Sequence, residues 1–151
     1  MGNDPQREFL RHVLATLTYR MRVAARNAPP GFVNTRLNDS SRSAGQILAH
    51  MGDLVDWAFT IAQGKQTWHS SSAQGWDLDI RRFNGSLDRL DEFLRGAEPL
   101  SCPATKLFQG PLADALTHTG QIAMLRRAAG SPVEFENYFQ AEIAPGAKLS
   151  P

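Results

Sequence analysis

Four long stretches of this chain repeat apolar residues at spacings of three and four, and this periodicity restricts the fold more than any other feature. An α-helix turns once in about 3.6 residues, so such spacing places the apolar side chains on one face. No convincing run alternates apolar and polar residues as a strand would. The pattern therefore predicts an all-α fold, an up-down four-helix bundle. The predicted helices are Pro5–Asn27, a segment from Ser43 to about Gly64, Trp76–Arg95 and Ala104–Ala129.

Local signals refine the ends and the shape of these helices. Ser43 with Gln46 three residues later fits a capping box at the start of the second helix. Pro111, inside the last long helix, removes a backbone donor and predicts a bend near Gly110. The aromatic and apolar residues of Glu134–Ile143 predict a short extra C-terminal helix that covers the bundle. We expect the residues after Pro145 to be loosely held.

Length and charge exclude several classes of protein. At 151 residues the chain is expected to form a single domain, residues 1–151. Lysine and arginine number 16 against 15 acidic residues, so no basic surface for nucleic acid is indicated. No signal peptide or apolar run of about 20 residues is visible, so no membrane span is expected. The lone cysteine, Cys102, fits a cytoplasmic location and is expected to be an inert thiol.

The candidate functional residues are concentrated in two of the predicted helices. Asp114 and His118 lie four residues apart, so they share one helix face, and Gln121 follows on the same stripe. His50 lies on the apolar face of the second helix. A carboxylate and an imidazole on a core-directed face cost free energy unless something compensates, and a metal ion would. We therefore predict His50, Asp114 and His118 as metal ligands. Taken alone, His50 is better explained as a buried histidine that is hydrogen-bonded to a neighbouring helix.

Other polar and aromatic residues have simpler interpretations. His12 lies off the apolar stripe of the first helix, and His69 lies in a serine-rich loop, so both are expected to be solvated. Trp68, in the same loop, is a candidate to shield the mouth of a pocket. Asp53 is expected to be an exposed acid. The alternative is that it supports His50 as a metal ligand. Gly120 is expected to permit close approach of another helix.

The potential ligands stand within longer segments that resemble the DinB-like family of metalloenzymes. Members of that family are four-helix bundles whose divalent metal is held by three histidines, one on the second helix and two in a His-x-x-x-His pattern on the last. His50 corresponds to the first of these and His118 to the last, whereas Asp114 stands where the family often has histidine. The resemblance covers the four long helices, and the residues that carry it are Ile47–Leu54, Asp114–Gln121 and Met124–Arg127.

The resemblance implies a divalent-metal-binding protein and a metal-dependent enzyme acting on a small molecule. The family includes thiol-dependent transferases, so an S-transferase activity with a low-molecular-weight thiol is one expectation, and metal-assisted hydrolysis is another. Two histidines and a carboxylate suit zinc, nickel, iron or manganese and do not select among them. Gln121 is expected to support the site or to contact the cofactor or substrate.

A second hypothesis gives the bundle no catalytic role. The protein would then be a helical bundle that binds a small ligand or another protein, with a relic metal site. Trp57, Trp68 and Trp76 would line the pocket or the interface. Homodimer formation is compatible with either hypothesis.

Overall fold

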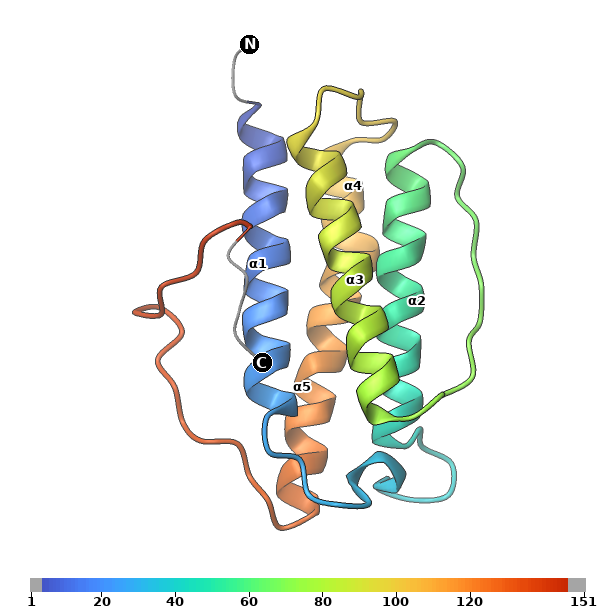
Figure 1. Cartoon of the computed structure of the whole chain (residues 1–151), viewed down its shortest axis with the longest axis vertical. Coiled ribbons are helices and arrows are strands. Elements are labelled where there is room, and N and C mark those ends of the chain that lie inside the picture. Colours follow the sequence, from blue (N-terminus) through green and yellow to red (C-terminus); the bar gives the residue numbers. More distant parts are fainter. Residues whose placement is uncertain (1–3, 147–151) are drawn as a thin grey trace.

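The chain folds into a bundle of four long helices, shown in the computed structural model of Figure 1, which describes residues 4–146. No strand occurs among these residues, so the predicted all-α bundle is confirmed. A 3₁₀ turn, η1 (Phe32–Asn34), follows the first helix, and α4 (Ala104–Leu107) and a π-helical turn (Phe108–Leu112) precede the last. The long helices are α1 (Pro5–Ala25), α2 (Ala44–Ala62), α3 (Trp76–Arg95) and α5 (Ala113–Ala128).

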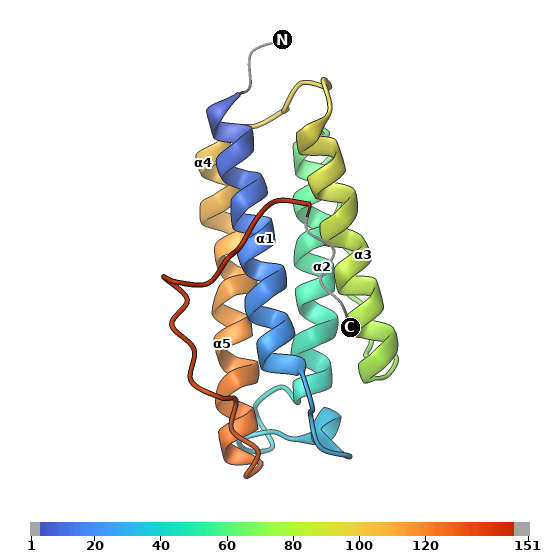
Figure 2. The ribbon, with the colours of Figure 1, turned by 60° about the vertical axis from the view of Figure 1, so that its left-hand side comes forward.

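The four long helices form the corners of a square. Both α1 and α2 pack against α3 and α5, so α1 and α2 lie on one diagonal and α3 and α5 on the other (Figures 1 and 2). The apolar stripe predicted for α1 is buried in full. Within the described residues, no helix is both long and apolar enough to cross a membrane. The large side chains that are fully buried in the core include Leu10, Leu17, Met21, Leu48, Met51, Phe83, Leu90, Leu94, Leu107, Leu112 and Ile122.

The connection between α2 and α3 crosses the length of the bundle instead of turning back at once. Residues 63–75 run along the outside, and α3 then proceeds in the same direction as α2 (Figure 1). The side-chain pairs Arg82–Asp53 and Ser86–Asp56 advance together along both helices, as parallel neighbours do. Thirteen extended residues reach about 43 Å, which exceeds the roughly 30 Å length of a 20-residue helix. The bundle is thus up-down at its first and third connections and has a crossover at its second.

The start of α2 is fixed by the predicted capping box. The Ser43 hydroxyl accepts a hydrogen bond from the Gln46 backbone N–H at 3.2 Å, and the Gln46 side-chain oxygen accepts from the Ser43 N–H at 2.8 Å. Two otherwise unpaired backbone donors are satisfied in this way. The side toward which His50 points follows from the apolar face of α2, since Ile47 and Leu54 on that face are buried.

The last long segment bends where proline predicted it. Gly110 has φ −89° and ψ −105°, outside the helical region, and Pro111 follows within the π-helical turn. Proline cannot donate to the preceding turn, so the helix is interrupted and restarts as α5. The restart places Asp114 in the first turn of α5.

The expected short helix over Glu134–Ile143 is absent, and this segment is extended apart from a turn at 138–140. It lies beside α1, where the Arg20 guanidinium stacks 3.9 Å from the centre of the Tyr138 ring. Phe135 and Phe139 are 96% and 97% exposed, so the apolar spacing that suggested a helix has no surface to pack against. The expectation for the tail after Pro145 falls almost wholly outside the described residues.

Candidate metal centre

The structure brings His50, Asp114 and His118 together from two helices. One donor atom of each lies within 4.8 Å of the other two. Nε2 of His118 is 3.4 Å from Oδ1 of Asp114, and Nε2 of His50 is 4.0 Å from its Oδ2. Two facts produce this convergence: Asp114 and His118 are one helical turn apart, and α2 packs beside α5.

The three side chains differ in their access to solvent. His118 is buried at 8% exposure, and the side chain of His50 is 18% exposed. The two imidazole rings meet edge to face, with their centres 4.8 Å apart. Asp114 is 48% exposed, so its carboxylate is not the buried charge that the sequence suggested. The free-energy cost of burying a carboxylate therefore does not indicate a metal site. The indication is the convergence of the three donor atoms. The site opens to solvent on the Asp114 side.

Gln121 holds the ring of His118 in a defined orientation. Its side-chain oxygen lies 2.8 Å from Nδ1 of His118. An amide oxygen only accepts, so Nδ1 carries a proton, and in the neutral ring Nε2 would present a lone pair toward Asp114. Histidines that bind metals usually donate their second ring N–H in this way. Without a cation or an added proton, acceptor atoms of His118 and Asp114 face each other.

The surroundings of His50 favour its neutral form. Burial lowers the pKa of His50, and the positive charge of Arg42 and the neighbouring His118 lower it further, against the opposing effects of Asp114 and Asp53. A neutral imidazole is the form that binds a metal ion.

The donor atoms suit a small divalent ion in kind, and one pair already has the spacing that such an ion requires. Zinc binds nitrogen and carboxylate oxygen at about 2.0–2.2 Å, which puts two ligands at a tetrahedral angle about 3.4 Å apart. The His118–Asp114 pair already has a separation of 3.4 Å. The His50–Asp114 pair, at 4.0 Å, would need to close by only about half an ångström. The three donor atoms spread as far as 4.8 Å apart, so a bound ion would draw the three side chains closer together.

Two tryptophans form an apolar wall beside His50. The Trp68 ring lies edge to face with the His50 ring, with their centres 5.7 Å apart, and Trp57 packs against Trp68 at the same distance. Trp68 thus lies beside the trio, where a shield would be needed. Trp76 lies elsewhere, against Phe32 at 5.2 Å. Trp57 and Trp68 therefore pack on each other, whereas Trp76 has a different aromatic partner, and the interface of the second hypothesis stays a prediction.

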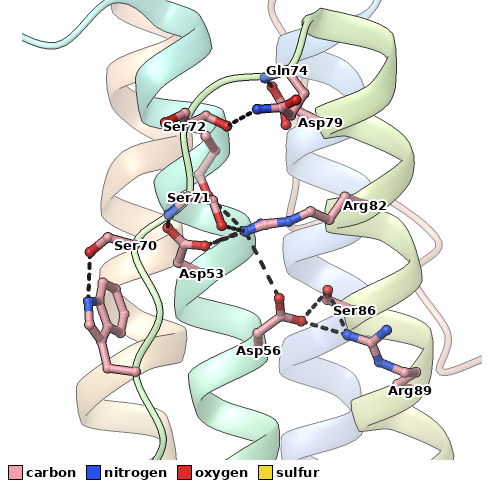
Figure 3. A network of polar contacts seen from close by, with 12 residues as sticks. Asp53, Asp56, Ser70, Ser71, Ser72, Gln74, Asp79, Arg82, Ser86 and Arg89 are labelled. Carbon is pink, nitrogen blue, oxygen red and sulfur yellow. Dashed lines mark hydrogen bonds and ion pairs between the residues drawn. The ribbon is translucent and has the colours of Figure 1, made fainter.

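The crossover segment that carries Trp68 is fastened to α2 by Asp53 and Arg82 (Figure 3). Asp53 accepts a hydrogen bond from the Ser71 N–H at 2.8 Å and one from the Arg82 guanidinium, which also donates to the Ser71 hydroxyl at 3.0 Å. Asp53 is only 4% exposed, so the expectation of a surface acid is wrong. Gly52 leaves room for the guanidinium, because a Cβ there would lie 2.5 Å from it.

Acid is expected to weaken this fastening. Burial raises the pKa of Asp53, but the hydrogen bonds from Arg82 and Ser71 outweigh it, so the pKa is lowered overall. A lowered folded-state pKa gives stability that is complete above about pH 4 and is lost as the pH falls through the folded pKa. We expect Asp53→Asn to lower the free energy of unfolding at pH 7 by about 2 kcal/mol and to reduce its acid dependence.

Urea denaturation at a series of pH values measures this effect. Asp39→Asn, at an exposed position of the connector before α2, is the matched control and should change neither quantity. An Asp53→Asn protein that loses stability with acid as steeply as the wild type would contradict the assignment.

The remaining sequence candidates lie outside the trio. His12 and His69 are exposed, as expected. Gly120 is also exposed, and a Cβ there would meet nothing within 4 Å, so the expectation of close helix approach is wrong. Burial raises the pKa of the Cys102 thiol, which agrees with an inert cysteine.

Sequence reasoning missed one charged residue beside the site. Arg42 is close enough to His50 to lower its pKa, although it lies in the connector before α2. A signal was present, because Arg42 immediately precedes the Ser43 cap and so belongs to the end of α2 nearest His50.

No protein-family model, curated protein or solved structure matches this chain. The DinB-like family thus stays a prediction from the sequence.

Proposed function

We propose that this protein is a DinB-like metalloenzyme in which His50, Asp114 and His118 hold one divalent metal ion. The observation that carries the proposal is the convergence of three donor atoms within 4.8 Å, one of them on a histidine whose other nitrogen is bonded to Gln121. A polar cluster that only stabilised the core would pair donors with acceptors. In the neutral ring, the Nε2 lone pair of His118 faces a carboxylate oxygen at 3.4 Å, and a cation between them would satisfy both acceptors.

The arrangement leaves room for chemistry at the metal. Three protein ligands leave further coordination positions open, and zinc, nickel, iron and manganese all accept this donor set. A bound ion of this kind lowers the pKa of a thiol or water that reaches it. Trp68 limits water on the His50 side, and the exposed Asp114 marks the side from which a small molecule enters.

Transfer of a thiol to an electrophile is the reaction that we propose first, and metal-assisted hydrolysis is the alternative. The thiol would be a low-molecular-weight compound, because Cys102 is remote from the site. Its neighbour Ser101 donates to the carbonyl of Ala62 at 2.9 Å, at the end of α2. His50 precedes Ala62 by twelve residues, or about 18 Å along the helix.

The contact between Gln121 and His118 makes a specific test possible. Gln121→Leu keeps the approximate volume of the side chain but removes the acceptor for Nδ1, so we expect zinc affinity to fall about 10- to 100-fold. Competition with a chromophoric chelator measures the affinity. Thr117→Ala is the control, since the Thr117 hydroxyl bonds only to its own helix, at the Ala113 carbonyl. Equal zinc affinity in Gln121→Leu and wild type would count against His118 as a ligand.

A further inference from the structure

A separate pocket opens beside His118, on the side of α5 that carries Gln121. Its volume is about 310 Å³, at the lower end of the range for small-ligand sites. It lies between the connector that precedes α2, the first turns of α2 and the middle of α5. Ile47, Met124 and Leu125 form an apolar wall.

Two of the polar side chains that line this pocket, Arg42 and Gln121, have donor groups without an acceptor in the described part of the chain, whereas Ser41 is bonded to Asn38 and His118 to Gln121. Arg42 lines the pocket, and its guanidinium makes no hydrogen bond or ion pair with any residue in 4–146. Gln121 also lines it. The Gln121 oxygen is engaged by His118, and over the same residues its amide nitrogen finds no acceptor. No aspartate or glutamate belongs to the pocket lining.

We propose that this pocket binds a small organic carboxylate. The acid group would accept from Arg42 and Gln121, because a guanidinium pairs well with the two oxygens of a carboxylate. The apolar part would lie on Ile47 and Met124. This inference rests on the proposed function and extends it, because His118 borders both the pocket and the metal trio. The carboxylate would be part of the molecule that reacts at the metal. Binding of the carboxylate itself requires no metal.

Hexanoate and its neutral counterpart hexanamide test the proposal on the full chain. The protein is first freed of metal with a chelator, so that the acid cannot bind to an ion instead. Affinities are measured by ¹H–¹⁵N NMR titration at low ionic strength, where charge interactions are least screened. We expect hexanoate to bind about fivefold more tightly than hexanamide and Arg42→Gln to remove the difference. Arg36→Gln, also exposed in the connector, should preserve it.

Met124→Trp provides a second variant. The indole ring is larger than the methionine side chain, so it would fill the pocket from an exposed position and weaken the binding of both compounds. Equal affinities for the two compounds, a preference that survives Arg42→Gln, or unchanged binding to Met124→Trp would each overturn the proposal. The number of zinc ions bound by wild type and by Arg42→Gln distinguishes a failure of this proposal from a failure of the proposed metal site. A hexanoate preference in a protein that binds no zinc would refute the metal site alone.

Discussion

Replacement of His118 by alanine is expected to abolish the stabilisation that a divalent metal gives to the folded protein. A ligand present at about 1,000 times its dissociation constant stabilises a fold by about 4 kcal/mol. For a domain of this size, each kcal/mol corresponds to a shift of about 2–4 °C in Tm. We therefore expect zinc to raise the Tm of the wild type by roughly 8–16 °C over the chelator-treated protein. His118→Ala, which removes the most buried of the three ligands, should show almost no shift.

His12→Ala is the matched control, because it removes an exposed histidine from another helix and should retain the full shift. A zinc-dependent shift of the same size in His118→Ala would contradict the proposed centre. A wild-type Tm that is indifferent to both zinc and chelator would favour the alternative, a non-catalytic bundle with a relic site.

Replacement of Arg126 by methionine is expected to cost about 3 kcal/mol of unfolding free energy, the largest loss that we expect from any change outside the metal trio. Arg126 is only 3% exposed although it is charged. Its guanidinium donates to the carbonyls of Ala24 and Arg26 at 2.9 and 2.8 Å, where α1 ends and its last carbonyls lack helical partners. It also donates to the Ser131 carbonyl at 2.9 Å, which fixes the chain after α5. Methionine fills much of the space but leaves these acceptors unpaired.

Urea denaturation at neutral pH measures this loss. The adjacent Arg127 is exposed, so Arg127→Met should stay within about 0.5 kcal/mol of wild type. Similar stabilities for the two variants would show that Arg126 does not join the ends of α1 and α5 as the geometry indicates. The sequence already placed both arginines in the last turns of a helix, but the partner helix became visible only in the structure.

The parts of the fold that follow from local rules could be predicted from the sequence. The stripe that includes Leu10, Leu17 and Met21 is buried because a regular helix must turn it to one side. The cap at Ser43 and the bend at Pro111 are also local, since each depends on hydrogen bonds within one turn of backbone.

The features that depend on distant partners could not be predicted in this way. The crossover between α2 and α3 is held by Asp53 and Arg82, which are 29 residues apart, and neither residue alone indicates the other. The prediction of a helix at Glu134–Ile143 is wrong because a short amphipathic helix forms only where its apolar face can pack against other residues. Phe135 and Phe139 are almost fully exposed instead.

The candidate site combines both kinds of information. The pairing of Asp114 with His118 follows from their spacing of four, and Gln121, three residues later, reaches the same ring. The approach of His50 requires the packing of α2 on α5, which the apolar stripes and the resemblance suggested and the structure shows. The pocket at Arg42 depends on how the connector packs, for which the sequence has no signal.

The most direct test of the central claim is the position of a bound ion in crystals grown with zinc, located by anomalous scattering at the zinc edge. We predict one strong peak about 2.0–2.2 Å from Nε2 of His50, Nε2 of His118 and a carboxylate oxygen of Asp114. A zinc-loaded crystal with no peak within bonding distance of all three side chains would contradict it.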